Sequence, residues 1–341
     1  MLKRLKKHLS NALKRYDALE MQLKAIRENG YTIQFIDNPE LEVQLAAVSD
    51  NGYVIKCIKQ PSIEVQLAAV KENGHAIELI NSPIIEVQLE AVKQTGYAIE
   101  HIKNPAVEVQ LVAVKKNGFA IKHIKSSEFK VQLAAVEQNG HAIQFIDRPT
   151  IEVQIAAVKE NGFTIKYIDC PELKVQLAAV SENGFAIKFI KQSAVEVQLA
   201  AVKQNGYTIK YIKHPELEVQ LIAIEQDAYN IKYIDNPAVE TQLKAVKKDS
   251  YTIQCIDKPP IKVQLAAVSE KGLAIKFIKN PEFKVQLAAV KQNGTAIKFI
   301  NNPAVEVQLA AVKEDDLAIQ YIDSPAAEVR LEATWRHYTM Y

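Results

Sequence analysis

The sequence repeats itself every 22 residues, and this period constrains the fold more than any other feature. With Asp17 taken as position 1, residues 17–324 divide into 14 repeats without an insertion, and a shorter fifteenth repeat covers residues 325–341. Twelve of the 13 prolines fall at position 1, where Ser127 and Ser193 stand in two repeats, and all 11 glycines fall at position 14. A fixed period punctuated in this way predicts one elongated domain of stacked, equivalent units.

Each repeat begins with a segment that has the features of a helix. Proline at position 1 suits the first helical turn, because its missing N–H is not needed there. Asn-Gly at positions 13–14 is typical of a helix end, so we expect a first helix over positions 1–12. Asn or Ser at position 22, just before the proline, has the chemistry of an N-cap. The expected caps are Asn38, Ser82, Asn104, Asn236, Asn280, Asn302 and Ser324.

The rest of the repeat reads as a second, shorter helix. Apolar residues at positions 15, 16, 17, 19 and 20 break strict strand alternation and favour a helix, although a solenoid that contains strands stays open for so short a run. A helix of six or seven residues is not stable alone and must pack on its neighbours. On a helical wheel of the first helix, positions 3, 7 and 10 cluster, and positions 5 and 9 widen this expected core face. We therefore predict an all-α, right-handed solenoid that advances ~10 Å per repeat, or ~140 Å in all.

Blocks of the form VQLAAVKxNGxAI, such as residues 197–209, give the chain a resemblance to known proteins. It resembles tandem short-helical-repeat proteins of unknown function from giant viruses, phages and bacteria, and its rhythm is similar to that of HEAT-like repeats. The likeness covers residues 17–324. It implies a helical-repeat architecture and supplies no catalytic residues. A viral or phage origin would imply interference with a host factor.

One polar residue interrupts the expected core face in every full repeat. Position 6 is glutamine throughout repeats 1–14 and Arg330 in the last repeat. A buried amide must be hydrogen-bonded, so we expect the ladder to satisfy backbone groups at helix ends and turns. A polar track that reads a long ligand is the alternative. After Gln22, the ladder consists of Gln44, Gln66, Gln88, Gln110, Gln132, Gln154, Gln176, Gln198, Gln220, Gln242, Gln264, Gln286 and Gln308.

Motifs for catalysis or cofactor binding are absent from the sequence. Glycine occurs only at position 14, which excludes a glycine-rich phosphate loop, and neither His-Glu-x-x-His nor Cys-x-x-Cys occurs. Cys57, Cys170 and Cys255 are far apart, which suggests a reducing, cytoplasmic compartment. We expect no catalytic residue, no cofactor and no metal.

Four histidines lie in adjacent repeats, and they are the nearest approach to a metal site. They are His75, His101, His123 and His141. His101 and His123 share position 19 and are expected to be neighbours, but no carboxylate or thiol falls clearly with them. We interpret these histidines as substitutes for aromatic residues at half-exposed positions, with a metal site as the alternative.

Positions 15 and 19 hold 18 of the 23 tyrosines and phenylalanines. Four consecutive repeats carry rings at both positions and a lysine at position 18. These residues are Phe163, Lys166, Tyr167, Phe185, Lys188, Phe189, Tyr207, Lys210, Tyr211, Tyr229, Lys232 and Tyr233. They are ordinary packing between the second helices, or anchors for a partner, since aromatic residues are enriched at binding hot spots.

Charge argues against nucleic acid as that partner. Residues 149–236 hold nine lysines and 11 acidic residues, and the whole chain is only +2, whereas a phosphate-binding track is strongly basic. Residues 1–16 are the exception, with six basic residues and no acidic one. We expect them to form an amphipathic helix, with Leu2, Leu5, Leu9 and Leu13 in one stripe, that caps the array or contacts a membrane surface. Trp335, Tyr338 and Tyr341 suggest a C-terminal lid.

These features predict a non-enzymatic repeat scaffold that binds another protein through its stacked helices. The alternatives are a solenoid that binds nucleic acid and a structural spacer without a ligand. No apolar stretch is long enough to span a bilayer.

Overall fold

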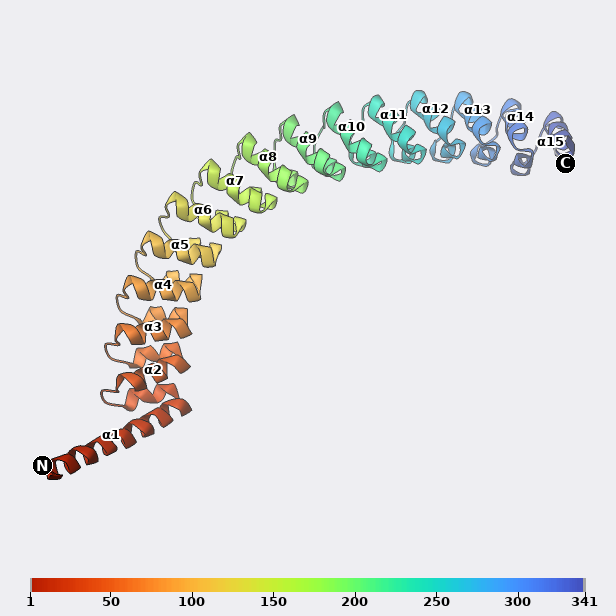
Figure 1. The fold of residues 1–341 in the computed structure, drawn as a ribbon. Coiled ribbons are helices and arrows are strands. Elements are labelled where there is room, and N and C mark those ends of the chain that lie inside the picture. The colour runs from red at the N-terminus through yellow and green to blue at the C-terminus, as the bar shows by residue number, and fades with distance from the viewer. Residues whose placement is uncertain (1, 340–341) are drawn as a thin grey trace. The chain divides into compact units, whose positions relative to one another are not determined.

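The computed structural model describes residues 2–339, with side chains described at residues 4, 8 and 11–335. Within this range the chain is helical, contains no strand, and alternates α-helices with short 3₁₀ helices, as Figure 1 shows. It forms two compact units, Met1–Val175 and Gln176–Tyr341. The α-helices of successive repeats pack on one another from α1 to α7 in the first unit and from α9 to α15 in the second, and the 3₁₀ helices form a second layer beside them. This arrangement is that of an α-solenoid and confirms the predicted fold class.

Repeats 2–14 use the same boundaries, with the α-helix at positions 3–12 and the 3₁₀ helix (η) at positions 14–19. In the first repeat the α-helix begins earlier, at Leu2, and in the last it continues to Thr339. The α-helices are α1 (Leu2–Glu28), α2 (Leu41–Asp50), α3 (Ile63–Glu72), α4 (Ile85–Gln94), α5 (Val107–Lys116), α6 (Phe129–Gln138), α7 (Ile151–Glu160), α8 (Leu173–Glu182), α9 (Val195–Gln204), α10 (Leu217–Gln226), α11 (Val239–Lys248), α12 (Ile261–Glu270), α13 (Phe283–Gln292), α14 (Val305–Glu314) and α15 (Ala327–Thr339). The 3₁₀ helices are η1 (Gly30–Phe35), η2 (Gly52–Cys57), η3 (Gly74–Leu79), η4 (Gly96–His101), η5 (Gly118–His123), η6 (Gly140–Phe145), η7 (Gly162–Tyr167), η8 (Gly184–Phe189), η9 (Gly206–Tyr211), η10 (Ala228–Tyr233), η11 (Ser250–Cys255), η12 (Gly272–Phe277), η13 (Gly294–Phe299) and η14 (Asp316–Tyr321).

The α-helix starts two residues later than the sequence suggested. The N-cap is position 2, as at Glu40 (φ −64°, ψ 157°), so the proline precedes the cap instead of lying in the first turn. Six of the seven expected caps at position 22 have positive φ instead, for example 49° at Asn38 and 50° at Asn104. Asparagine tolerates this left-handed conformation better than most residues. The Asn-Pro pair therefore makes the turn into the helix, and the prediction that position 22 caps it was wrong.

The Asn-Gly pair at positions 13–14 also works differently from the expected helix stop. Asn51 is extended (φ −151°, ψ 111°), and its side chain accepts a hydrogen bond from the N–H of Tyr53, which caps η2. Glycine does not adopt positive φ at this position. It is required by close packing, because a Cβ on Gly96 would lie 2.5 Å from the carbonyl oxygen of Ala113 in the next repeat. Position 14 is thus the point of closest approach between neighbouring repeats.

The second helix of each repeat is a 3₁₀ helix, which refines the prediction of a short helix. Its i→i+3 hydrogen bonds close at the end of the segment, as from the N–H of Ile58 to the carbonyl of Ile55 at 3.0 Å. Six residues complete only about two 3₁₀ turns, so this layer depends on its packing against the α-layer. Ile55 is 2% exposed and Ile58 is 8% exposed, which places both in the shared core.

The core comes from positions 5, 9 and 10 of the α-helix together with positions 16, 17 and 20 around the 3₁₀ helix. In repeat 2, Val43, Ala47, Val48 and Val54 are fully buried. The expectation that position 3 belongs to the core was wrong, since Ile63 is 48% exposed. Position 3 lies in the first helical turn, where the previous repeat no longer covers it. Leucine at position 7 is half-buried.

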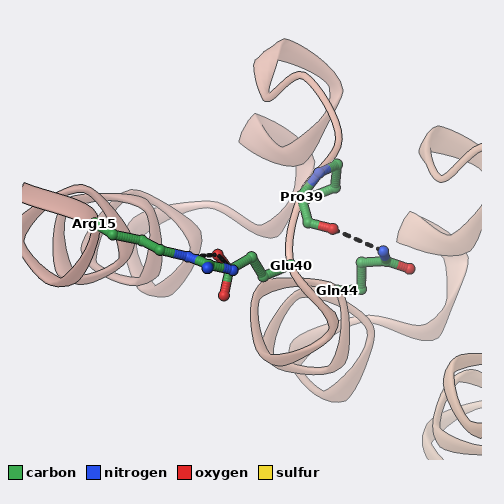
Figure 2. Close-up of polar contacts among 4 residues, drawn as sticks. All are labelled: Arg15, Pro39, Glu40 and Gln44. Carbon is green, nitrogen blue, oxygen red and sulfur yellow. Dashed lines mark hydrogen bonds and ion pairs between the residues drawn. The ribbon is translucent and has the colours of Figure 1, made fainter. Parts of the chain in front are cut away.

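Residues 2–16 continue without a break into the α-helix of repeat 1, so that α1 spans 27 residues. Leu13 and Tyr16 are each 61% exposed, so these two side chains contribute little to a cap on the first repeat. The side chains of Leu2, Leu5 and Leu9 lie outside the described ones. Arg15 forms an ion pair with Glu40 at 2.7 Å (Figure 2). None of the helices between residues 2 and 339 combines the length and apolarity needed to cross a bilayer.

The last repeat covers repeat 14 by ordinary stacking of α15 on α14. Val329 and Ala333 are buried there, whereas Leu331 is 71% exposed and Trp335 is 65% exposed. Trp335 therefore does not form the buried aromatic cover that the sequence suggested. Tyr338 and Tyr341 lie outside the described side chains.

We predict that Gly96→Ala destabilises the fold by about 1–3 kcal/mol, because the new methyl group would overlap backbone atoms of repeat 5. Gly30→Ala is the matched control, since its Cβ would lie 3.2 Å from the carbonyl oxygen of Ala47 and 3.3 Å from a methyl group of Val54. Urea denaturation followed by circular dichroism measures both variants. Equal midpoints for the two would contradict the proposed role of glycine in close packing.

Candidate functional site

The glutamine ladder forms the same hydrogen bond in repeat after repeat. The side-chain Nε2 of position 6 donates to the carbonyl oxygen of position 1 in its own repeat, at 2.9 Å from Gln44 to Pro39 (Figure 2). Eleven further glutamines make this bond at 2.8–3.1 Å: Gln66, Gln88, Gln110, Gln132, Gln154, Gln198, Gln220, Gln242, Gln264, Gln286 and Gln308. Arg330 keeps it with its guanidinium, which donates to Pro325 at 3.0 Å. The ladder therefore satisfies the carbonyl at each entry turn.

The oxygen of the amide points to the next repeat. Gln220 Oε1 accepts hydrogen bonds from the N–H of Ala238 at 3.2 Å and from the hydroxyl of Thr241 at 2.9 Å. Most other repeats have valine at position 5, and the corresponding oxygens are buried without a partner in Gln110, Gln198, Gln242, Gln264 and Gln308. Gln220 is 8% exposed, while most ladder glutamines are half-buried. These contacts belong to the interior of the array, which supports the structural interpretation over a ligand-reading track.

A second set of polar links between repeats was missed in the sequence. The side chain at position 12 reaches back to position 14 of the preceding repeat, as when Glu72 Oε2 accepts from the N–H of Gly52 at 2.5 Å. Gln292 makes the same bond to Gly272 at 2.5 Å and also donates to the carbonyl of Glu270 at 3.3 Å. These partners are unpaired groups at a helix end. The frequent Glu or Gln at position 12 was the available signal.

The four histidines do not converge on a metal site. His75 packs edge-to-face against His101 at 5.7 Å between ring centroids, and His123 packs in the same way against Tyr97 at 6.1 Å. They occupy positions 15 and 19, where most repeats carry an aromatic ring, as the sequence suggested. Across the part of the chain that the structure describes, no group of three or more His, Cys, Asp or Glu side chains could hold a metal ion.

His123 has a perturbed acidity. Its Nε2 lies 3.8 Å from a carboxylate oxygen of Glu100. Burial lowers its pKa below 6.5, with Lys122 and His101 adding to this effect and Glu100 opposing it. The neutral imidazole is therefore the form that the fold favours.

The aromatic rings pair between repeats, in a register that the sequence did not reveal. Position 15 of one repeat meets position 19 of the next, as in Tyr207 with Tyr233 at 5.0 Å and Phe185 with Tyr211 at 6.3 Å between centroids. Tyr229 comes last in this run, because position 19 of the following repeat is Cys255. Of the predicted site residues, Phe163, Lys166 and Tyr167 belong to the N-terminal compact unit and the others to the C-terminal one.

The aromatic rings at positions 15 and 19 keep an exposed edge. Phe189 is 37% exposed, Tyr207 38% and Tyr211 39%, whereas Phe185, Tyr229 and Tyr233 are half-buried. Edge-to-face packing fixes the rings, and their outer edges still meet solvent. Both of the predicted roles, packing and an available surface, are therefore compatible with this geometry.

In repeats 8–10, each lysine at position 18 lies over the ring that follows it. The ammonium nitrogen is 4.7 Å from the ring centroid of Phe189 for Lys188, 4.8 Å from Tyr211 for Lys210, and 4.8 Å from Tyr233 for Lys232. Cation–π attraction holds such pairs together. We call the nine residues of repeats 8–10 the lysine–aromatic row: Phe185, Lys188, Phe189, Tyr207, Lys210, Tyr211, Tyr229, Lys232 and Tyr233.

Lys210 is the most tightly held lysine of the row. Its ammonium donates a hydrogen bond to the hydroxyl of Tyr207 at 2.8 Å, with the nitrogen 4.0 Å from that ring's centroid. This hydrogen bond lowers the pKa of Tyr207 and raises that of Lys210. The positive charge at the centre of the row is thus held against the Tyr207 ring.

The structure also separates charge between its two layers. Residues 171–236 contain seven lysines and eight acidic residues. These nearly equal totals conceal an uneven distribution of the two charges between the layers. Five of these lysines lie at positions 18 and 21, within the 3₁₀ helix or two residues after its end, together with one acidic residue, Asp235. The other acidic residues lie in the α-layer and the turns that flank it. The lysine–aromatic row is therefore basic although its repeats are not.

A second exposed surface follows position 3 of the α-helices. In the C-terminal unit it contains Leu217, Val239, Ile261 and Phe283, which are 38–48% exposed.

The three cysteine thiols show no feature of a reactive site. Cys57 and Cys255 are half-buried and Cys170 is exposed, and all three are unpaired. Burial raises the pKa of Cys255, which disfavours the reactive thiolate.

We predict that Gln220→Leu destabilises the array by about 1 kcal/mol more than Gln242→Leu. Both variants strand the carbonyl of position 1, but only the first also strands the hydroxyl of Thr241 and the N–H of Ala238. Urea midpoints measure the difference. It should shrink in a Thr241→Val background, where only the Ala238 bond remains to be lost, and an unchanged difference there would show that the hydroxyl plays no part.

We predict that His123 lowers stability at acidic pH. Because its pKa is lowered in the fold, the unfolded chain takes up a proton first as the pH falls through about 6.5. The free energy of unfolding should therefore decrease with falling pH less steeply in His123→Phe, a ring found naturally at this position in Phe145. Parallel denaturation series at about pH 8 and pH 5 compare the two chains. Identical pH slopes would contradict the prediction.

Comparison with known proteins adds no further constraint. No protein-family model matches the sequence, and searches of curated proteins and of solved structures find no match.

Proposed function

We propose that the chain is a non-enzymatic repeat scaffold that binds another protein, and that the lysine–aromatic row is its contact surface. The observation that carries this proposal is a run of three consecutive repeats in which part-exposed rings lie beneath lysine ammonium groups. Aromatic residues with an exposed edge are typical anchors at protein interfaces. The row occurs on the 3₁₀ layer. Apart from repeat 7, which belongs to the other compact unit, no other repeat carries phenylalanine or tyrosine at positions 15 and 19 together with lysine at position 18.

Preorganisation supports the proposal energetically. Binding normally loses side-chain entropy when long or rotatable groups are immobilised. Here the Tyr207 and Tyr233 rings are already packed together, and Lys210 is already hydrogen-bonded to Tyr207. A partner would therefore meet a surface that needs little further ordering.

Nucleic acid is the second candidate, favoured by the basic 3₁₀ segments beside aromatic rings. The adjoining α-layer opposes it. In repeat 10 this layer and its flanking turns carry Glu216, Glu218, Glu225 and Asp227. A wide polyanion such as a duplex would meet these acidic groups, whereas a narrow protein segment can follow the row alone.

We predict that Tyr211→Ala combined with Tyr233→Ala weakens binding of the captured partner by about 2–4 kcal/mol. The matched control is Tyr97→Ala with Phe145→Ala, which removes two half-exposed rings from repeats outside the row. The partner is captured from native lysate with nuclease present, identified by mass spectrometry, purified and titrated against each variant.

Circular dichroism must show that each variant is folded before affinities are compared. Equal loss of affinity in the two double variants would contradict the proposed site, as would loss only in an unfolded variant. A partner that disappears on nuclease treatment would favour the nucleic-acid alternative.

A further inference from the structure

The lysine–aromatic row also constrains the chemistry of what it binds, if the row is the contact surface proposed above. Its 3₁₀ helices η8, η9 and η10 pack side by side in the C-terminal compact unit. One lysine of position 18 therefore recurs once per repeat. Neighbouring helices pack at about 8–10 Å, so Lys188, Lys210 and Lys232 present positive charges about 10 Å apart.

This spacing matches a polyproline II segment better than a β-strand or an α-helix. Polyproline II advances about 3.1 Å per residue with three residues per turn, so every third side chain lies on the same face about 9 Å further on. A β-strand advances about 3.3 Å per residue but alternates faces, so its third residue points away from the row. An α-helix advances only 1.5 Å per residue and needs about six residues to cover the same distance.

The rings favour the same conformation. Grooves lined by aromatic side chains dock polyproline II segments, whose backbone is already extended and ordered. In the row, Phe189 and Tyr211 expose 37% and 39% of their surface between successive lysines. Apolar residues between the charged ones would contact these ring edges.

The positive charge of the row predicts that its ligand is negatively charged. Besides the three lysines at position 18, Lys191 and Lys213 at position 21 are exposed along the same segments, against the single Asp235. Cations of this row attract carboxylates, and an acidic chain would be steered to the 3₁₀ layer and away from the acidic α-layer.

We propose that the lysine–aromatic row binds an acidic polyproline II segment that carries a carboxylate at every third residue. Three lysines require a core of about seven residues with the pattern Glu-x-x-Glu-x-x-Glu, in which the intervening residues are proline or apolar. The run ends where position 18 becomes Gln254 in repeat 11.

The test uses the full chain and two labelled peptides of equal composition. One peptide contains Glu-Pro-Pro-Glu-Pro-Pro-Glu, and the other contains the same residues with the three glutamates adjacent. Fluorescence anisotropy should show that the spaced peptide binds at least about fivefold more tightly, with affinity that falls as salt rises. Equal affinity of the two peptides would overturn the proposed register.

Two sets of variants locate the site. Lys188→Gln, Lys210→Gln and Lys232→Gln together should weaken the spaced peptide about tenfold or more, and glutamine is native at this position in Gln34, Gln144 and Gln254. The control set is Lys56→Gln, Lys122→Gln and Lys298→Gln. It removes the same charge from lysines that also lie over rings, at 5.0–5.1 Å, but in separate repeats. Equal weakening by the two sets would refute the site.

A labelled oligothymidylate of similar charge completes the design. Row-dependent binding of this oligonucleotide that is tighter than that of the spaced peptide would overturn the acidic-peptide assignment. If the spaced peptide shows no preference while capture of a protein partner still depends on Tyr211 and Tyr233, only the proposed ligand chemistry fails. If capture is also independent of these rings, the proposed function fails with it.

Discussion

The contact between neighbouring repeats is the interaction on which the rest of the structure depends. Neither helix of a repeat is long enough to be stable alone, and each buries its apolar side only against the next unit. Valine, alanine and valine at positions 5, 9 and 10 are fully buried in this contact. Glycine at position 14 brings the backbones together, as at Gly96 and the carbonyl of Ala113. Polar bonds from positions 6 and 12 then satisfy the backbone groups that these short helices leave open.

This contact also explains why a glutamine can recur inside an apolar run. Its nitrogen satisfies the carbonyl of the turn that begins the repeat, and in Gln220 its oxygen reaches the helix start of the following repeat. A hydrophobic residue would fill the same space and leave the carbonyl without a partner. Arg330 donates the equivalent hydrogen bond to the carbonyl of position 1, although its side chain is not an amide. The ladder is thus part of the scaffold, and the candidate binding surface lies in the other layer.

The sequence predicted the period, the two helices per repeat and the solenoid, because proline, glycine and apolar residues recur at fixed positions. It misplaced finer details that depend on neighbouring repeats. Asn38 was expected to cap a helix, and instead takes positive φ before the proline. Ile63 was expected in the core, but it is 48% exposed. The pairing of Tyr207 with Tyr233, and the separation of lysines from acidic residues, arise only when repeats stack. A count of charge along the chain cannot reveal them.

The central claim about function is that a protein partner contacts the 3₁₀ layer at the lysine–aromatic row. Site-specific photocrosslinking tests it most directly, with p-benzoylphenylalanine placed singly at positions 189, 211, 145 and 222. Phe189 and Tyr211 belong to the row, Phe145 is an exposed ring outside it, and Ile222 lies on α10 in the other layer. Crosslinks to the purified partner at positions 189 and 211, and not at 145 or 222, are the predicted result. Crosslinking from position 222, or equally from all four positions, would contradict the account.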